Sequence, residues 1–191
     1  MIVGILLAAG RGTRFGSHKL LHLLPDGTPI VVAALRNLAQ GADEVIAVVR
    51  PDDAALMQLL AREHARVLPC PNAELGMGAS LACGVRAAPN ADAWLIAPAD
   101  MPFIASATMS AVVQQLRTGT PLVAPSYQDQ RGHPVGFAAE FFPALSTLTG
   151  DSGAKSVIET HRLRLQLIPC DDPGVLRDID VQSDLLNNVT D

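Results

Sequence analysis

A glycine-rich loop that carries two basic side chains follows the first apolar segment of the chain. Gly10, Gly12 and Gly16 allow the backbone to turn sharply and to present its N–H groups to a ligand. Arg14 and Lys19 add two positive charges to the same loop. Glycines and cations in this arrangement indicate a triphosphate-binding loop. A glycine-rich surface turn would explain the glycines, but it would not explain two basic residues at one strand end.

Neither of the two commonest phosphate-binding motifs fits this loop. The dinucleotide fingerprint is G-x-G-x-x-G, whereas Gly16 comes one residue too late to be its third glycine. The P-loop has Lys directly after its last glycine, whereas Ser17 and His18 separate Gly16 from Lys19. The glycine spacing therefore disfavours a dehydrogenase and excludes the P-loop pattern.

A carboxylate, Asp100, follows a later apolar stretch at residues 93–97. Ligands of open parallel sheets bind where the carboxyl ends of the strands meet. A carboxylate at that edge can hold Mg²⁺ against phosphate oxygens. The structural alternative is that Asp100 only caps the helix that follows.

Two further segments have both a functional and a structural interpretation. Gly76, Gly78 and Ser80 would let a flat base or a sugar approach the start of a helix closely. The same segment could be an ordinary helix start, with a local side chain as the N-cap. His133 lies beside Arg131 in a polar, turn-rich stretch, where binding and structural roles are both open.

Short apolar runs alternate with amphipathic segments along the chain. The runs are typical of strands buried on both faces and occupy residues 2–8, 44–49, 93–97, 121–124 and 165–169. Helices are expected at residues 30–38, 53–63, 80–87, 108–116, 140–148 and 154–161. Residues 126–137 indicate a hairpin or loop rather than another buried strand. We therefore expect one α/β domain over residues 1–191, a Rossmann-like, three-layer α/β/α fold with a mostly parallel sheet.

Composition excludes several classes of protein. The 191 residues have a net charge of -5, one Trp, one Tyr and five Phe, which is unsuited to nucleic-acid binding. No apolar stretch approaches the roughly 18–20 residues that a membrane span needs, so we expect no membrane partner. The three cysteines fit neither a disulfide framework nor a zinc site, and the N-terminus does not resemble a signal peptide. These features predict a cytoplasmic protein.

Residues 7–19 resemble the signature L-A-A-G-x-x-x-R-x-G-x-x-K of the MobA-like nucleotidyltransferases, the family of the molybdenum cofactor enzymes. The resemblance covers nearly the whole chain and is most specific to the cytidylyltransferase branch. It implies the nucleotidyltransferase fold, with Arg14, Lys19 and Asp100 as catalytic side chains. The nucleotide-binding residues that it implies are Leu7, Ala8, Ala9, Gly10, Arg11, Gly12, Arg14, Lys19, Gly78 and Ser80.

The later segments imply metal and second-substrate residues. Asp100 matches the family's metal-binding position, and Asp180 matches its second metal carboxylate in a D-I-D segment. The segments RGHP and GDSGAK resemble family segments that assign His133 and Asp151 to the second substrate. In GDSGAK, Lys155 stands where the family has Arg, and lysine cannot make the bidentate contacts of a guanidinium.

Four other aspartates near the C-terminus, Asp171, Asp172, Asp178 and Asp184, are given structural interpretations. Asp178 and Asp184 are expected to be solvated or capping residues. Asp172, with its neighbour, is expected to form a simple turn ahead of a proline.

The resemblance implies transfer of CMP from CTP to the terminal phosphate of molybdopterin, with Mg²⁺ as cofactor and pyrophosphate as the leaving group. Such a phosphate has a second pKa near 6, so no general base is required at neutral pH. Ala9 favours CTP, because the related guanylyltransferases carry Gly there and an added Cβ narrows the pocket. The expected protein partner is a molybdenum enzyme or its chaperone.

Three alternatives stay open at this point. One methyl group gives only about 1–3 kcal/mol of discrimination, so GTP could be the nucleotide. The chain could also be a non-catalytic accessory protein that binds the cofactor, although Lys19, Asp100 and Asp180 argue against this. The same fold also serves enzymes of sugar phosphates and isoprenoid precursors.

Overall fold

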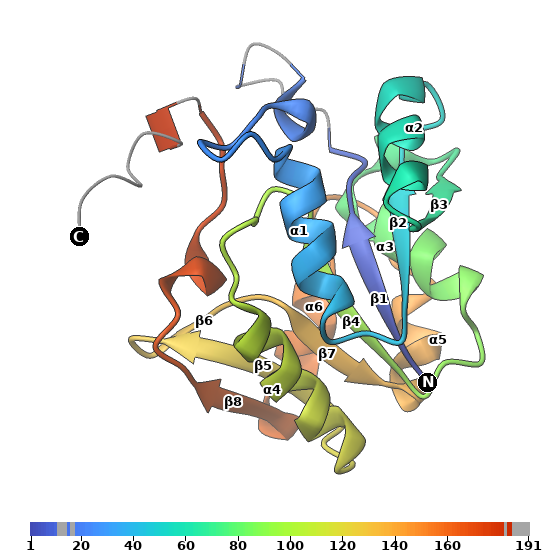
Figure 1. Cartoon of the computed structure of the whole chain (residues 1–191). Coiled ribbons are helices and arrows are strands. Elements are labelled where there is room, and N and C mark those ends of the chain that lie inside the picture. Colours follow the sequence, from blue (N-terminus) through green and yellow to red (C-terminus); the bar gives the residue numbers. More distant parts are fainter. Residues whose placement is uncertain (11–14, 16–17, 182, 185–191) are drawn as a thin grey trace.

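The apolar runs near the N-terminus form the parallel half of a sheet. β1 (Ile2–Leu7) lies between β2 (Glu44–Val49) and β4 (Ala93–Pro98), and β3 (Arg66–Pro69) extends the sheet beyond β2. All of β1 except Leu7 is buried, as expected for a strand covered on both faces. The structure is a computed structural model that describes residues 1–10, 15, 18–181 and 183–184 (Figure 1).

The other half of the eight-stranded sheet contains the antiparallel pairs. β7 (Val135–Ala138) lies between β4 and β5 (Leu122–Tyr127) and runs antiparallel to both. On the far side, β6 (Gln130–Arg131) turns back onto β5, and β8 (Leu165–Pro169) pairs with β5 in parallel.

The sequence-based prediction for residues 126–137 is only partly correct. The turn between β5 and β6 is the expected hairpin, but β7 is a strand inside the sheet with three buried residues. β7 has only four residues, and Gly136 interrupts its apolar character, so no apolar run marks it in the sequence. The short β3, which begins with an arginine, was missed for a similar reason.

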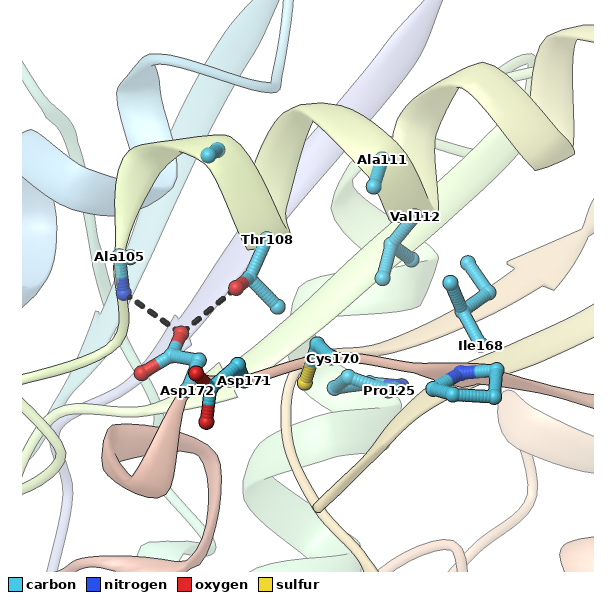
Figure 2. A pocket seen from close by; sticks show the side chains of 11 residues that line it. Ala105, Thr108, Ala111, Val112, Pro125, Ile168, Cys170, Asp171 and Asp172 are labelled. Atoms are coloured by element: carbon cyan, nitrogen blue, oxygen red, sulfur yellow. Dashed lines mark hydrogen bonds between the residues drawn. The ribbon is translucent and has the colours of Figure 1, made fainter.

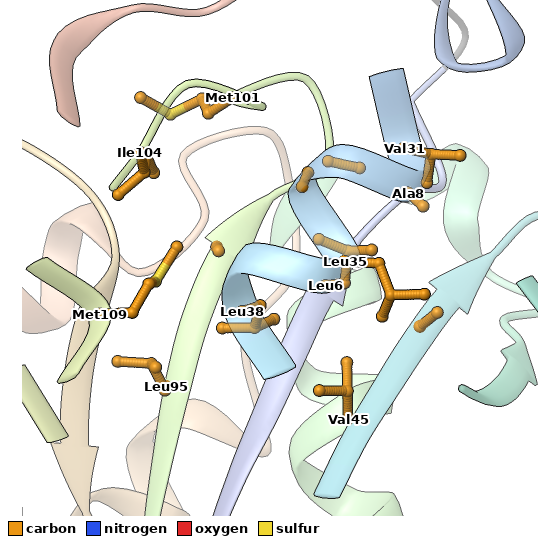
Figure 3. Packing of buried hydrophobic residues seen from close by; sticks show 14 of the residues in the cluster. Leu6, Ala8, Val31, Leu35, Leu38, Val45, Leu95, Met101, Ile104 and Met109 are labelled. Atoms are coloured by element: carbon orange, nitrogen blue, oxygen red, sulfur yellow. The ribbon is translucent and has the colours of Figure 1, made fainter. Parts of the chain in front are cut away.

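Helices cover both faces of the sheet and create two cores. Leu6 and Leu95 pack with α1 (Ile30–Ala39) and α4 (Ser106–Arg117) on one face (Figure 3). Ile5 and Trp94, which alternate with them along the strands, pack on the opposite face with α3 (Met77–Ala87). The three-layer α/β/α fold with a mostly parallel sheet is therefore confirmed.

The remaining helices are short. They are α2 (Ala54–Arg62), α5 (Phe142–Leu145), α6 (Lys155–Thr160) and the 3₁₀ turns η2 (Lys19–Leu21), η3 (Ala73–Leu75), η4 (Ala139–Phe141), η5 (Arg162–Arg164) and η6 (Pro173–Leu176). Within the described residues, no helix has the length and apolar character to cross a membrane.

Candidate active site

The carboxyl ends of β4, β1 and β2 border a cavity of about 400 Å³. These strands are adjacent in the sheet, and α3 begins beside the same edge (Figure 1). The cavity is therefore at the edge predicted from the order of the strands. Its lining residues are Leu7, Ala9, Gly10, Arg50, Ala73, Glu74, Gly76, Met77, Ser80, Pro98, Asp100 and Asp151.

A buried lysine joins the glycine-rich loop to two carboxylates. The Nζ of Lys19 donates to Oδ2 of Asp100 at 2.8 Å and to Oδ1 of Asp180 at 3.4 Å. Lys19 is only 9% exposed. A buried ammonium requires such partners, because an unpaired charge out of water is strongly unfavourable. Residues from three distant parts of the sequence thus meet at one charged centre.

Asp178 extends this centre to three carboxylates. One oxygen from each of Asp100, Asp178 and Asp180 lies within 4.8 Å of the others. Asp178 is exposed, as expected of a solvated residue, and its carboxylate also belongs to this acidic group. Partial burial, with the charges of Asp180 and Asp100, raises the pKa of Asp178. Carboxylate oxygens grouped in this way are ligands suited to hard cations such as Mg²⁺ or Mn²⁺.

Backbone contacts hold the C-terminal aspartates against the end of β4. Ile179 is fully buried, and its N–H donates to the carbonyl of Asp100 at 2.9 Å. In extended chain, side chains two residues apart point to the same side. Burial of Ile179 therefore turns Asp178 and Asp180 together toward Asp100.

Asp172 anchors the segment that leads to these aspartates. Its carboxylate accepts hydrogen bonds from the N–H of Ala105 at 2.9 Å and the hydroxyl of Thr108 at 2.6 Å, at the start of α4 (Figure 2). It also accepts from the N–H of Gly174 at 3.0 Å. Asp172 is 8% exposed beside a second cavity, of about 260 Å³. Asp172 is therefore more than a turn residue, because it ties η6 to α4.

The loop around Asp151 packs on the first residues of α3. Gly76 has φ +106°, and a Cβ there would lie 2.4 Å from Oδ1 of Asp151. The N–H of Gly78 donates to the carbonyl of Gly150 at 2.7 Å, and a Cβ at Gly78 would lie 2.6 Å from the carbonyl oxygen of Thr149. Glycine at these two positions permits the close approach.

His133 has one buried polar atom with an unmet hydrogen bond. The backbone N–H of His133 donates to the carbonyl of Val175 at 2.9 Å. The ring atom Nδ1 has no hydrogen-bond partner within the described part of the chain. Burial, reinforced by the charge of Arg131 and opposed by that of Asp100, lowers the pKa of His133 to about 4. The imidazole is therefore neutral at physiological pH.

Many of the predicted site residues meet at this edge of the sheet. Leu7, Ala9, Gly10, Ser80, Asp100 and Asp151 line the cavity, and Lys19 and Asp180 contact Asp100 beside it. Three other predicted residues, Ala8, Gly78 and His133, are not in the cavity wall. The side chain of Ala8 is part of the core, and Gly78 packs on the 149–150 backbone. Arg11, Gly12 and Arg14 lie outside the described residues.

Sequence reasoning missed Arg50, Glu74 and Asp178. Arg50 directly follows β2 and Glu74 lies in η3, both at the predicted ligand edge. The position of Arg50 at a strand end could have drawn attention to it, but neither residue belongs to a recognisable motif. Asp178 had a clearer signal, namely its spacing of two from Asp180.

Residues 4–166 match the family model described as the MobA-like NTP transferase domain. Nicotine blue oxidoreductase of Paenarthrobacter nicotinovorans is 30% identical over 188 residues, which are 94% of this chain and 92% of that protein. The purine catabolism protein PucB of Bacillus subtilis is 30% identical over 94% of this chain and 91% of its own length. A molybdenum cofactor guanylyltransferase of Burkholderia vietnamiensis is 41% identical over 54% of this chain and 50% of its own length.

Solved structures share this architecture. Rv0371c of Mycobacterium tuberculosis superposes with a TM-score of 0.85 at 27% identity, covering 98% of this chain and 97% of that chain. The same protein in complex with manganese has a TM-score of 0.80 at 27% identity, with 98% and 99% covered.

Proposed function

The chain belongs to the MobA-like NTP transferase family, and on that premise we propose that it transfers CMP from CTP to the terminal phosphate of molybdopterin. Pyrophosphate is the leaving group. The observation that carries the proposal is the contact of Lys19 with Asp100 and Asp180 beside a cavity at the strand ends. An ammonium and grouped carboxylates are suited to bringing polyphosphate and cation together.

The three carboxylates Asp100, Asp178 and Asp180 would hold the divalent cation, for which we propose Mg²⁺. Their oxygen donors fit such an ion, and a bound ion would supply neutralisation of phosphate charge. Lys19 would then turn from the carboxylates toward the triphosphate. Gly10, at the rim of the cavity, would offer its backbone N–H to a phosphate oxygen.

The attacking group would be an already ionised phosphate oxygen of the second substrate. It would attack the α-phosphorus of the nucleotide as the bond to the β-phosphate oxygen breaks. A phosphate monoester is largely dianionic at pH 7, so the step requires positioning and charge neutralisation rather than a base. With its pKa lowered to about 4, His133 would be a weak base, which is consistent with a site that does not depend on proton abstraction.

We assign His133 to the second substrate on the resemblance of the RGHP segment. Asp151 carries the same assignment as a prediction; it lines the cavity beside Gly76.

CTP is the proposed nucleotide because Ala9, where the related guanylyltransferases carry Gly, is one of the residues that line the cavity. GTP is the second candidate, since a relative at 41% identity over 105 residues is named a guanylyltransferase. A molybdenum enzyme or its chaperone is the proposed recipient of the product. The three free cysteines support the reducing cytoplasm as the proposed compartment.

Pyrophosphate release tests the proposal directly. The protein is incubated with molybdopterin and Mg²⁺, and CTP, GTP, ATP and UTP are supplied one at a time. Release with CTP alone is the expected result, whereas release mainly with GTP would keep the reaction and overturn the base assignment. Binding of molybdopterin without release from any nucleotide would instead indicate an accessory protein.

The chain offers a matched pair of variants for this assay, because Lys19 and Lys155 are its two lysines. Lys19→Met should lower kcat about 10²–10³-fold, the scale of losing one well-placed electrostatic contact. Lys155→Met removes the same charge from an exposed position in α6 and should leave kcat unchanged. Equal activity of the two variants would remove Lys19 from the mechanism.

A further inference from the structure

The cavity extends across three neighbouring strand ends, which gives it a phosphate end and a base end. Asp100 lies at the β4 end, next to the acidic cluster, and Gly10 follows β1 in the middle. Arg50 follows β2 at the other end. Adjacent strands are about 4.8 Å apart, so the β2 end is roughly 10 Å from the β4 end. With the phosphates at Asp100, the base, which is one ribose away, falls toward β2.

Arg50 is a cationic side chain held at this base end. Its side chain is 17% exposed, and its Nε and Nη2 contact the carboxylate of Asp52 at 3.1 and 3.4 Å. This side-on contact uses two of the five N–H donors of a guanidinium. The N–H donors on the opposite edge of the guanidinium are the ones that can bond to a ligand in the cavity. Asp52, at 72% exposed, orients the guanidinium from the solvent side.

Glu74 adds an acceptor to the donors of Arg50. Both residues line the cavity, and Glu74 lies in η3 just before α3. A guanidinium fork recognises two neighbouring acceptors, such as O6 and N7 of guanine, and a carboxylate accepts from the exocyclic amine of cytosine. Cytosine has two neighbouring acceptors, O2 and N3, next to its amine. Uracil interrupts its two carbonyl acceptors with an N–H donor, and adenine places its amine donor beside both N1 and N7.

We infer that Arg50 recognises the base of the bound nucleotide and favours a base with two neighbouring acceptors. This inference rests on the proposed nucleotidyl transfer and adds to it the residue that reads the base. Glu74 is the expected second contact when the base is cytosine. Arg50 is a specificity-determining residue and takes no part in the chemical step.

The test compares three variants by calorimetric titration and by steady-state kinetics. Arg50→Met removes the charge, and Arg50→Lys keeps the charge but not the fork. Arg36→Met is the matched control, because Arg36 makes a similar side-on contact with Glu63, at 2.9 Å from both Nε and Nη2, on a helix that contributes nothing to the cavity wall. The probes are CTP, GTP, ATP, UTP and inorganic tripolyphosphate, each with Mg²⁺.

Arg50→Met should weaken binding of the preferred nucleotide about tenfold or more, since a bidentate base contact discriminates on that scale. Its affinity for tripolyphosphate, which has no base, should stay within about twofold of wild type, and KM should rise while kcat is retained. Arg50→Lys should not restore affinity, and Arg36→Met should match wild type.

Two results would overturn the inference. Equal losses for nucleotide and tripolyphosphate would make Arg50 a phosphate ligand, and no loss for either would leave it a surface residue. Failure of the proposed reaction has a different signature, because wild type itself would then bind no nucleotide or release no pyrophosphate. Thermal unfolding of each variant separates a loss of binding from a loss of folding.

Discussion

Replacing Lys19 by Met removes the cation that joins two carboxylates of the three-carboxylate cluster. Its Nζ contacts Asp100 and Asp180, and the oxygens of these two and Asp178 lie within 4.8 Å of one another. Without the ammonium, and without a divalent cation, the carboxylates repel one another. Methionine keeps the length and apolar stem of the side chain, so the main change is electrostatic.

The magnitude follows from Coulomb's law and from the exposure of the partners. An ammonium and a carboxylate 2.8–3.4 Å apart attract by about 1–1.5 kcal/mol in water and by about 5–6 kcal/mol at an effective dielectric constant of 20. Asp100 and Asp180 have side chains 27% and 49% exposed, which favours the lower value. Lys19→Met loses two such contacts at about 1 kcal/mol each, so we expect a loss of about 2 kcal/mol in unfolding free energy, or about 4–8 °C in Tm for a chain of this length.

The assay is thermal unfolding of wild type, Lys19→Met and Lys155→Met in EDTA and again in saturating Mn²⁺. Lys155 has a side chain 70% exposed and lies 3.9 Å from Glu159, so its loss should cost at most about 1 kcal/mol. Mn²⁺ should raise the Tm of Lys19→Met more than that of wild type, because the ion replaces the missing positive charge. Equal Mn²⁺ effects on all three proteins would refute this account of the acidic cluster.

Three further changes test the site and its supports. Asp178→Asn should weaken Mn²⁺ binding about tenfold in calorimetry, since a carboxylate near 4 Å attracts a divalent ion by about 2 kcal/mol even in water; unchanged affinity would exclude it as a ligand. The pKa of His133 is lowered to about 4 in the folded chain. Below pH 6.5 the imidazole is protonated in the unfolded chain but stays neutral in the folded chain, so wild type loses stability as the pH falls. In His133→Asn, the loss of unfolding free energy between pH 7 and pH 5, measured by urea unfolding, should be about 1–2 kcal/mol smaller than in wild type. The same pH profile of stability in both proteins would contradict this. Gly78→Ala should destabilise the chain by about 1–3 kcal/mol, because its Cβ would meet the Thr149 carbonyl oxygen at 2.6 Å; a gain in stability, from the better helix propensity of Ala, would show that the contact relaxes.

The sequence by itself determined the general fold and the location of the site. Apolar runs such as β1 and β4 are long enough to mark buried parallel strands, and parallel strands bring their carboxyl ends to one edge. Because Asp100 follows β4 and Lys19 belongs to the loop after β1, their meeting was predictable despite the 81 residues between them. Local chemistry and strand order together were sufficient for this.

Tertiary structure alone decided which other side chains join the site. Asp178 reaches the acidic cluster because the N–H of the buried Ile179 donates to the carbonyl of Asp100, a contact between segments that no local pattern encodes. Arg50 lines the cavity because β2 lies beside β1, and Gly78 serves packing because the 149–150 backbone crosses it. Periodicity in a sequence records which face of an element is buried, but it does not record which distant element covers that face. The partners of these residues are therefore determined only when the chain folds into its tertiary structure.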